Sequence, residues 1–556
     1  MPVDRVAETI MDDGLIEGGP KGDRLTATGD RNVLLGKSGH DQLVASGDDN
    51  LLDGGPGNDR LTGTGNGSTL IGGSGSDVIN AAAQVLADGS AVAVTSLDGG
   101  DGKDQLIAGA EVEATFDAEA ATTLDGGEGR DELTARASAL AGLGATAANV
   151  LEGGGGNDQL TATVQADSLE SDATAANVLA GGLGNDGLAA TAAAATVLGN
   201  AAAANHLVGG AGKDALAGAA TAFALAGSAT AFNQLDGGAG RDELAGAATA
   251  SALGGGAEAA NALRGGAGHD LLTATADADA FIGAAVATNS VAGGAGHDAI
   301  FATAGAVSPL DAQAFNQLDG GAGHDHLSAT AVAVAAVGAR AANSLTGGAG
   351  DDQLSASAAA QDGFEARASN ALEGGAGADS LLAEIIGFGS SELSGGTGND
   401  QLSVIGGNGN LLDGGAGRDR FQGGAGDDAF VIDADDLRGS GTWLDGADGE
   451  DTVLVGFDLD LRGLGDGIAN IERLDLTDGA PNQLFLSLDD VLAVTDEAAT
   501  LFVEGDGAAA TGSAADAAVL VGDWTSGPAV DGFATFTLAS ATVNVDVDLT
   551  TDVVAS

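Results

Sequence analysis

The chain has 556 residues and a net charge of −62; it contains 96 glycines and no cysteine, and only 3% of its residues are aromatic. So few large side chains argue against several ordinary globular cores, and the missing thiols exclude a disulfide scaffold and thiolate metal sites. The acidic balance argues against nucleic-acid binding, because phosphate contacts need a basic face. We expect many of the carboxylates to bind cations from outside the chain.

The first segment, residues 1–15, is predicted to be a short amino-terminal cap or lead-in, with Val3, Val6, Ile10 and Leu15 as its main apolar members. The beginning of the chain lacks the basic start and the apolar stretch of a secretory signal. No apolar run in the sequence approaches the length of a membrane span, so we expect no transmembrane segment.

A glycine-rich hexapeptide, Gly-Gly-x-Gly-x-Asp, then recurs along most of the chain. Intact copies begin at residues 54, 72, 99, 126, 153, 181, 209, 237, 265, 293, 320, 347, 374, 395, 414 and 423, and degenerate copies at residues 18, 36 and 446. The spacing is 18 residues at first, 27 or 28 residues from residue 72 to residue 374, and irregular afterwards. A fixed period of this length indicates a repeat architecture.

Between the loops, apolar residues occupy every second position. After Asp158 come Leu160, Ala162 and Val164, which indicates a strand with one buried face. A glycine midway between loops, such as Gly227, supplies a second turn. One repeat is therefore loop, strand, turn, strand, and stacked repeats bury a thin layer of Ala and Leu between two parallel sheets. The predicted fold class is all-β: a parallel β-roll or β-solenoid with wide coils of 27–28 residues, plus a small β-rich carboxy-terminal domain.

The change in spacing predicts the domain organisation. Residues 16–71 are expected to form a narrow-coil β-roll of 18-residue repeats, residues 72–394 a wide-coil β-solenoid, and residues 395–455 irregular terminal coils. Residues 456–556 differ in composition and are expected to form a carboxy-terminal cap.

An asparagine stands four residues before many of the loops, at a position that alternation turns inward. The set comprises Asn149, Asn177, Asn205, Asn233, Asn261, Asn289, Asn316, Asn343 and Asn370, with Asn32, Asn50 and Asn410 in the shorter repeats. A buried amide must be paired, and identical amides stacked one coil apart can pair with each other. We predict a structural ladder; a ligand site on these residues is the alternative.

The loop composition predicts a metal site. Glycines let the backbone adopt positive φ and expose carbonyl oxygens, and the Asp adds a carboxylate. Stacking puts successive carboxylates about 5 Å apart, where two charges repel by roughly 3 kcal/mol at an effective dielectric constant near 20. A hard divalent cation between coils removes this repulsion, and flexible sites built only from oxygen suit Ca²⁺.

The motif Gly-Gly-x-Gly-x-Asp-x-Leu resembles the hallmark of the RTX proteins, the calcium-binding parallel β-roll, over roughly residues 16–455. The resemblance implies that the loop aspartates bind Ca²⁺: Asp59, Asp77, Asp104, Asp131, Asp158, Asp186, Asp214, Asp242, Asp270, Asp298, Asp325, Asp352, Asp379, Asp400, Asp419 and Asp428. The usual β-roll has a loop every nine residues on both edges, whereas here the second edge lacks it, so we expect one row of calcium along one edge.

The degenerate loops are weaker candidates for calcium. Lys21 and Lys37 replace loop glycines, which makes Asp23 and Asp41 doubtful ligands, and Asp451 is doubtful as well.

The segment from residue 456 contains "NIERLDLTDG" and "LSLDDVLAVTD" and ends in alternating Val and Asp. It looks like the carboxy-terminal region of type I secreted RTX proteins and large adhesins. This resemblance implies an uncleaved export signal, the type I secretion machinery as a partner, and an extracellular or cell-surface location. A β-rich cap that closes the solenoid is the simpler interpretation, and the two are compatible.

Several other features have plain interpretations. His40, His269, His297 and His324 occupy the fifth loop position, which carries Lys, Arg or Asn in other copies, so a variable polar surface position is favoured over a transition-metal site. Trp443 and Trp524 are expected to be core residues. No motif of a hydrolase, metalloprotease or phosphate-binding loop is present, so no enzyme activity is predicted.

The sequence therefore predicts a secreted calcium-binding structural protein, a component of a surface layer, filament or extracellular matrix that self-associates as a homo-oligomer or filament. The outward strand positions form a flat face of Ala, Thr and Ser, which makes an ice-binding module one alternative. An adhesin stalk and a carrier for a catalytic module are the others, although no separate ligand-binding or catalytic domain is visible.

Overall fold

The computed structural model describes residues 9–11, 13–361, 364–438, 442–462, 464, 467–496, 499–506 and 515–555. Val3 and Val6 of the expected lead-in lie outside these residues. The described residues form a parallel β-solenoid of about 16 turns with coils of about 27 residues, which confirms the predicted fold class.

The chain divides into two compact units. The first runs to Phe315 and includes Ala333–Ala339, and the second comprises Asn316–Val332, Arg340–Gln361 and the chain from Glu365 onward. In both units, strands alternate between two parallel sheets, here called sheet A and sheet B.

In the first unit, sheet A consists of β1 (Thr9–Met11), β3 (Arg24–Thr28), β5 (Gln42–Ser46), β7 (Arg60–Thr64), β9 (Val78–Ala87), β11 (Gln105–Ala114), β14 (Glu132–Ala141), β16 (Gln159–Ser168), β18 (Gly187–Thr196), β20 (Ala215–Ala224), β22 (Glu243–Ala252), β24 (Leu271–Ala280) and β26 (Ala299–Val307). Sheet B consists of β2 (Leu15–Glu17), β4 (Val33–Leu35), β6 (Leu51–Pro56), β8 (Ser68–Gly75), β10 (Ala91–Gly102), β12 (Ala118–Asp125), β13 (Glu128–Gly129), β15 (Ala145–Gly155), β17 (Ala173–Leu183), β19 (Ala201–Ala211), β21 (Ala229–Ala239), β23 (Ala257–Ala267) and β25 (Ala284–Ala295). Strand β27 (Asp311–Ala322) spans the boundary between the units.

Strands β28 (His326–Val334) of sheet A and β29 (Gly338–Ala349) of sheet B also have residues in both units. In the second unit, sheet A comprises β30 (Gln353–Gln361), β32 (Ser380–Ile386), β34 (Gln401–Ile405), β36 (Arg420–Gln422), β38 (Leu444–Asp445) and β41 (Ile468–Ala469). Sheet B comprises β31 (Arg367–Ala376), β33 (Gly389–Gly398), β35 (Leu411–Gly417), β37 (Ala429–Ile432), β39 (Thr452–Val455) and β42 (Arg473–Asp475).

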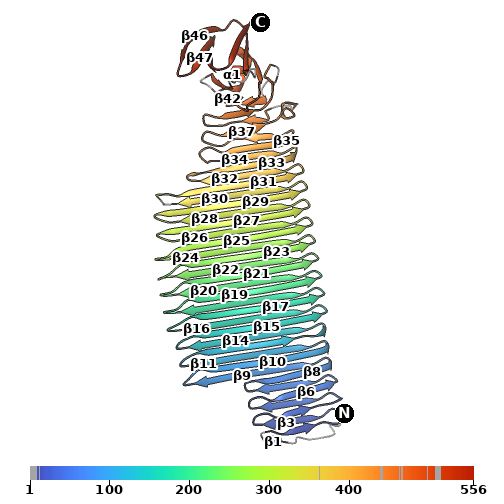
Figure 1. Ribbon diagram of the computed structural model, residues 1–556. Helices are drawn as coiled ribbons and strands as arrows, with labels where there is room; N and C mark the ends of the chain where they lie inside the picture. The colour runs from blue at the N-terminus through green and yellow to red at the C-terminus, as the bar shows by residue number, and fades with distance from the viewer. Residues whose placement is uncertain are drawn as a thin grey trace. The chain divides into compact units, whose positions relative to one another are not determined.

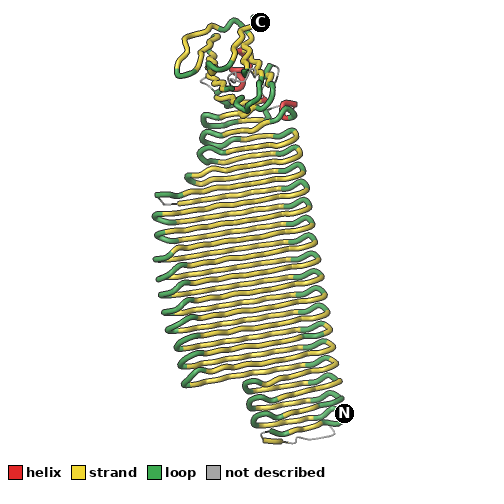
Figure 2. The backbone as a smooth tube through the Cα atoms, viewed as in Figure 1, coloured by secondary structure: helices red, strands yellow, loops and turns green. Residues whose placement is uncertain are grey.

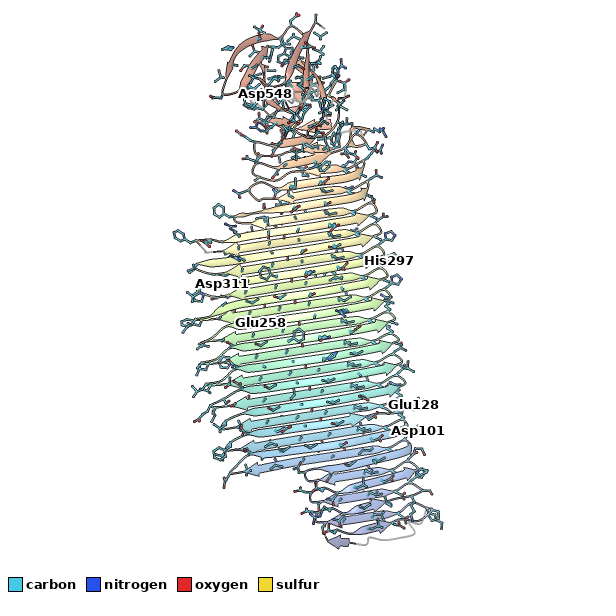
Figure 3. All side chains as sticks on the ribbon, viewed as in Figure 1. Asp101, Glu128, Glu258, His297, Asp311 and Asp548 are labelled. Atoms are coloured by element: carbon cyan, nitrogen blue, oxygen red, sulfur yellow. The ribbon has the colours of Figure 1, made fainter. Side chains whose placement is uncertain are left out.

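Two kinds of turn join the sheets. The first edge of the solenoid is defined as the turns that lead from a sheet B strand to the next sheet A strand, and the second edge as the turns that lead back. Asp270, for example, lies at the first edge between β23 and β24. Figure 3 labels His297 at the first edge and Asp311 at the second. Loops and turns line both edges in Figure 2.

The core follows the predicted alternation. In β16 the side chains of Leu160, Ala162, Val164 and Ala166 are buried, while the residues between them face outward. Neighbouring strands keep the same register, so that Leu160 pairs with Leu188 in β18. Because most inward residues are Ala, the two sheets face each other across the thin layer that the sequence predicted.

The asparagine ladder of the wide coils is confirmed. Each amide Nδ2 donates to Oδ1 of the next coil at 2.8–2.9 Å from Asn149 to Asn289, and again from Asn316 to Asn370. The same Nδ2 also reaches across the core, as from Asn261 to the Thr275 carbonyl oxygen at 2.7 Å. The ladder therefore ties sheet B to sheet A as well as coil to coil.

The end of the chain leaves the repeat. It contains α1 (Leu488–Val494), a parallel sheet of β40 (Leu459–Asp460), β43 (Gln483–Ser487), β45 (Ala517–Val521) and β49 (Thr550–Val554), and β44 (Thr500–Glu504), which pairs with β48 (Ala541–Asp546). Strand β47 (Phe533–Leu538) forms antiparallel pairs with β46 (Thr525–Val530) on one side and with β48 on the other. Trp443 and Trp524 are buried in this part of the chain, as predicted.

Candidate metal centre

The glycine-rich loops of the first edge stack directly on one another. Gly266 and Gly268 have φ of +106° and +150°, a conformation that side chains with a Cβ rarely adopt. A Cβ on Gly268 would lie 1.3 Å from the carbonyl oxygen of Gly240 in the preceding coil. Both the backbone conformation and the close approach therefore require glycine at these positions.

The loop aspartates form a continuous inner ladder at this edge. The Asp242 amide donates to Oδ1 of Asp270 at 2.7 Å, and the Asp270 amide donates to Oδ1 of Asp298 at 2.8 Å. Bonds of 2.6–2.8 Å of this kind link the consecutive residues Asp23, Asp41, Asp59, Asp77, Asp104, Asp131, Asp158, Asp186, Asp214, Asp242, Asp270 and Asp298, and in the second unit Asp325, Asp352, Asp379, Asp400 and Asp419. All of these side chains are buried.

The other oxygen of each carboxylate is in a different situation. Within the described residues, Oδ2 is buried without a hydrogen-bond partner in Asp41, Asp59, Asp77, Asp104, Asp131, Asp158, Asp186, Asp214, Asp242, Asp270, Asp352, Asp379, Asp400 and Asp419. It faces a small cradle at the first loop glycine: a Cβ on Gly265 would lie 2.5 Å from Asp270 Oδ2 and 2.7 Å from the Gly293 carbonyl oxygen. A carboxylate oxygen and a carbonyl oxygen of the next coil thus border the same space.

The narrow coils offer an internal comparison, because Asn replaces Asp at their second edge. The Asn32 amide donates to Asn50 Oδ1 at 2.8 Å, as in the aspartate ladder. The side-chain Nδ2 of Asn50, however, donates to the Gly47 carbonyl oxygen at 2.7 Å. The amide thus satisfies itself within its own turn, whereas a carboxylate has no proton to donate and needs a cation or a proton from outside. Asn32 and Asn50 therefore do not form the predicted ladder between side-chain amides. The backbone N–H of one residue donates to the side-chain Oδ1 of the other, because both residues lie in a turn and not in a strand.

Burial perturbs the protonation of the aspartate ladder. For Asp59, Asp104 and Asp131, burial is the largest cause that raises the pKa from the ordinary 3.8, and neighbouring carboxylates add to it, while the hydrogen bond from the backbone amide opposes it. The pKa of Asp59, Asp104 and Asp214 reaches about 6, and that of Asp131 about 7. At neutral pH the ladder therefore carries charge that the fold alone does not compensate.

These donors fit a hard cation. Within the described residues, no cluster of three or more His, Cys, Asp or Glu side chains converges on a point. Each candidate site therefore has one carboxylate per coil, supplemented by backbone carbonyl oxygens such as that of Gly293. Oxygen donors in a flexible loop suit Ca²⁺ better than Zn²⁺, which prefers nitrogen and sulfur, or Mg²⁺, which needs a strict octahedron.

The fifth loop position forms a second, outer ladder. The His297 amide donates to His269 Nδ1 at 2.8 Å, and the two imidazole rings stack with their centres 4.8 Å apart. An asparagine serves in the same way, since the Lys213 amide donates to Asn185 Oδ1 at 2.7 Å. The position is exposed, so the predicted polar surface role agrees with the geometry.

One residue lies on the wrong edge for the predicted single row. The loop that ends at Asp428 leads from β36 to β37, which is the second edge, and the Asp428 amide donates to Asp451 Oδ1 at 2.8 Å. The expectation that all intact loops share one edge is therefore wrong for this copy. The loops at residues 414 and 423 start only nine residues apart, so the chain completes half a coil between them. This nine-residue spacing is the sequence signal that would have placed the loop of Asp428 on the second edge.

The oxygens of Asp428 are also engaged differently. Its Oδ1 accepts bonds from the backbone and the side chain of Asn410, and its Oδ2 accepts the Gly424 amide at 2.8 Å. Asp451, whose Oδ2 is buried without a partner among the described residues, is the better candidate on this edge.

Near the ends of the first-edge ladder, Asp23 agrees with expectation, whereas Asp41 and Asp436 differ from it. Asp23 is a weak candidate because its Oδ2 accepts the Gly19 amide at 2.6 Å. Asp41 has the same arrangement as Asp59 despite Lys37 in its loop. Asp436, which has no glycine-rich loop to identify it, accepts the Asp419 amide at 2.6 Å and ends the first-edge ladder.

Comparison with known families agrees with this geometry. The family model of the RTX calcium-binding nonapeptide repeat (four copies) matches residues 17–52, 26–61, 53–84, 143–173, 255–286, 336–359 and 405–436. The chain is an RTX-type protein. RTX repeats bind calcium, so calcium is the ion that the family and the oxygen donors share. No curated protein matches the chain. Among the described residues, no helix is long and apolar enough to cross a membrane.

Proposed function

We propose that this RTX protein is an exported structural solenoid that folds when calcium fills sites between the stacked loops of its first edge. The observation that carries the proposal is the set of buried, unpartnered Oδ2 atoms named above, all of which except that of Asp419 lie beside a carbonyl oxygen of the next coil. The proposed ligands are the first-edge aspartates from Asp41 to Asp419, with Asp451 on the second edge. Calcium bound there supplies the positive charge that the ladder lacks.

Export follows from the same chemistry. A site assembled from two coils does not exist in the unfolded chain, so the free energy of calcium binding adds to that of folding. At low intracellular calcium the chain stays unfolded and fit for transport, and at millimolar extracellular calcium it folds. The resemblance of residues 456–556 to the end of type I secreted RTX proteins supports this route. A surface layer, filament or matrix is the role we assign to the folded protein.

Circular dichroism across a calcium titration tests the proposal. We expect a largely disordered spectrum in chelator, and a β spectrum that develops as calcium reaches the millimolar range. Magnesium at the same concentration is the control, and it should not replace calcium because it demands a strict octahedron. A full β spectrum in chelator would overturn the proposal.

A further inference from the structure

The second edge of the first unit carries exposed apolar side chains on five consecutive coils. They are Leu169, Val197, Leu225, Leu253 and Phe281, and we call them the apolar ridge. The Leu225 amide donates to the Thr196 carbonyl at 3.1 Å and the Leu253 amide to the Ala224 carbonyl at 3.0 Å, so the side chains stack coil on coil. They are 37% to 69% exposed, although an apolar side chain of this size is normally buried.

Four of the five turns that carry the apolar ridge are uncharged, although the chain is strongly acidic. The turns at residues 197–200, 225–228, 253–256 and 281–283 contain no Asp, Glu, Lys or Arg, whereas the turn of Leu169, at one end of the ridge, carries Glu170 and Asp172; the whole chain has a net charge of −62. At roughly 80 Å² for each half-exposed side chain, the ridge presents on the order of 400 Å², comparable to the largest patch on a typical monomer and the kind of patch that marks an interaction site.

A shallow groove lies on the outer face of sheet A over the same coils. It has a volume of about 330 Å³ and is lined by strands β18, β20, β22 and β24. Its walls are small side chains, such as Ala189, Thr191, Ala219, Ala247 and Thr275. Because the outward residues in these columns are small, the surface is hollow there, and it is apolar and free of charge.

Ridge and groove match each other in three respects. Both repeat at the strand spacing of about 4.8 Å, and both extend over the four coils from Val197 to Phe281, where neither carries charge. The ridge has branched and aromatic side chains, and the groove is lined by Ala, Gly and Thr. An anionic lipid surface is disfavoured as the partner because it would place fixed negative charge directly against a chain of charge −62. A second copy has the same net charge, but its groove places no charge against the ridge, and bound calcium lowers the repulsion between copies.

We infer that the apolar ridge of one copy docks in the sheet A groove of a second copy. The two surfaces lie on different sides of the coil, so each contact leaves a free ridge and a free groove at its ends, and the association is open-ended. The area of the apolar ridge is about half of the roughly 800 Å² that each partner buries in a standard interface. A single contact is therefore weak, and we expect association to be detected only at high protein concentration. This inference rests on the proposed function, because it supplies the lateral contact of a layer or filament.

Sedimentation velocity in millimolar calcium tests the inference with two variants. The ridge variant combines Leu225→Asp with Leu253→Asp, and the groove variant combines Ala219→Glu with Ala247→Glu. Circular dichroism first establishes that each variant reaches the wild-type β spectrum; where one does not, Leu→Ser or Ala→Gln at the same positions replaces it. We expect an open series of oligomers for the wild type, a monomer for each variant alone, and a dimer when the two variants are mixed, because the mixture retains one intact ridge and one intact groove.

Four results would overturn the inference. A mixture that stays monomeric excludes the pairing of ridge with groove, and a groove variant that still dimerises indicates contact between two ridges. A wild type that stays monomeric at high concentration with a full β spectrum excludes the assembly and leaves the calcium-folding proposal standing. A wild type without a β spectrum in calcium contradicts the proposed function first, and the inference falls with it.

Discussion

At the scale of single residues, the two oxygens of each loop aspartate have separate tasks. Oδ1 accepts a hydrogen bond from the backbone amide of the preceding coil. Oδ2 has no donor, and it faces the Gly293 carbonyl oxygen in the case of Asp270. An amide side chain can still accept the backbone amide through Oδ1, but it has no second oxygen for a cation. Asn50 in the narrow coils is an example.

Asp270→Asn should therefore have opposite effects in the two conditions. In chelator, it removes a buried charge that opposes folding, and we expect a gain of β signal over the largely disordered wild type. In saturating calcium, it removes a ligand, and we expect the free energy of unfolding to fall by about 1–3 kcal/mol. Circular dichroism in chelator and thermal melts in calcium check this. His269→Asn, in the same loop, is the control and should change neither measurement; a loss of stability in calcium with no gain of β signal in chelator for Asp270→Asn would indicate a purely structural residue.

The raised pKa values predict how stability depends on pH. A carboxyl group whose pKa is about 6 in the folded state and 3.8 in the unfolded state favours folding below pH 3.8, and this contribution is lost as pH rises through 6. For Asp59 it amounts to about 3 kcal/mol, so three such residues offset most of the 5–15 kcal/mol that stabilises a typical domain.

In chelator we accordingly expect the fold to be most stable near pH 4, where the ladder is protonated, and its stability to fall as pH rises until the chain is largely disordered at pH 7. Saturating calcium should abolish this fall, because calcium binds the deprotonated carboxylate and competes with protons. Melts at several pH values, with and without calcium, measure both trends. A chelated protein that becomes more stable toward pH 7 would contradict the buried, uncompensated ladder.

At the scale of the elements, the asparagine ladder joins strands within and between sheets. Asn233 accepts from Asn205, donates to Asn261, and also donates to the Ala247 carbonyl of sheet A. Asn233→Ala leaves buried polar atoms unpaired on both neighbours, so we expect the free energy of unfolding in calcium to fall by about 3–5 kcal/mol. Asn200→Ala, in an exposed turn, is the control and should cost less than about 1 kcal/mol.

The sequence alone predicted the core positions correctly wherever the alternation of inward and outward residues decides burial. Alternation placed Leu160 and Ala162 in the core, and parity placed Asn233 and Asn261 inside, because an inward amide in a stacked coil finds its own copy as a partner. Sequence reasoning placed Asp428 on the wrong edge. Its motif is intact, but the short strand β36 moves its loop to the second edge.

The apolar ridge was also beyond sequence reasoning. Leu225 and Leu253 lie beside turn glycines, and only the stacked coils show that they form one exposed row. Asp436 had no motif to mark it and was found only through its bond to the Asp419 amide.

At the scale of the whole molecule, net charge and calcium are linked. A charge of −62 keeps the chain apart from its copies and opposes compaction, and each bound calcium removes two charges from this total. The proposed function therefore makes folding, loss of repulsion and assembly depend on the same ion. We expect the protein to be unfolded and separate where calcium is scarce, and folded and able to associate where it is abundant.

The most direct measurement of this account is the anomalous scattering from crystals grown in calcium. We predict a row of peaks along the first edge, each beside Oδ2 of an aspartate and the first glycine of the next loop, with Asp214, Asp242 and Asp270 at consecutive sites. A further peak is expected at Asp451 on the second edge. Crystals of the folded protein with no peaks along the first edge, or with peaks only at the outer fifth-position side chains, would contradict the calcium ladder.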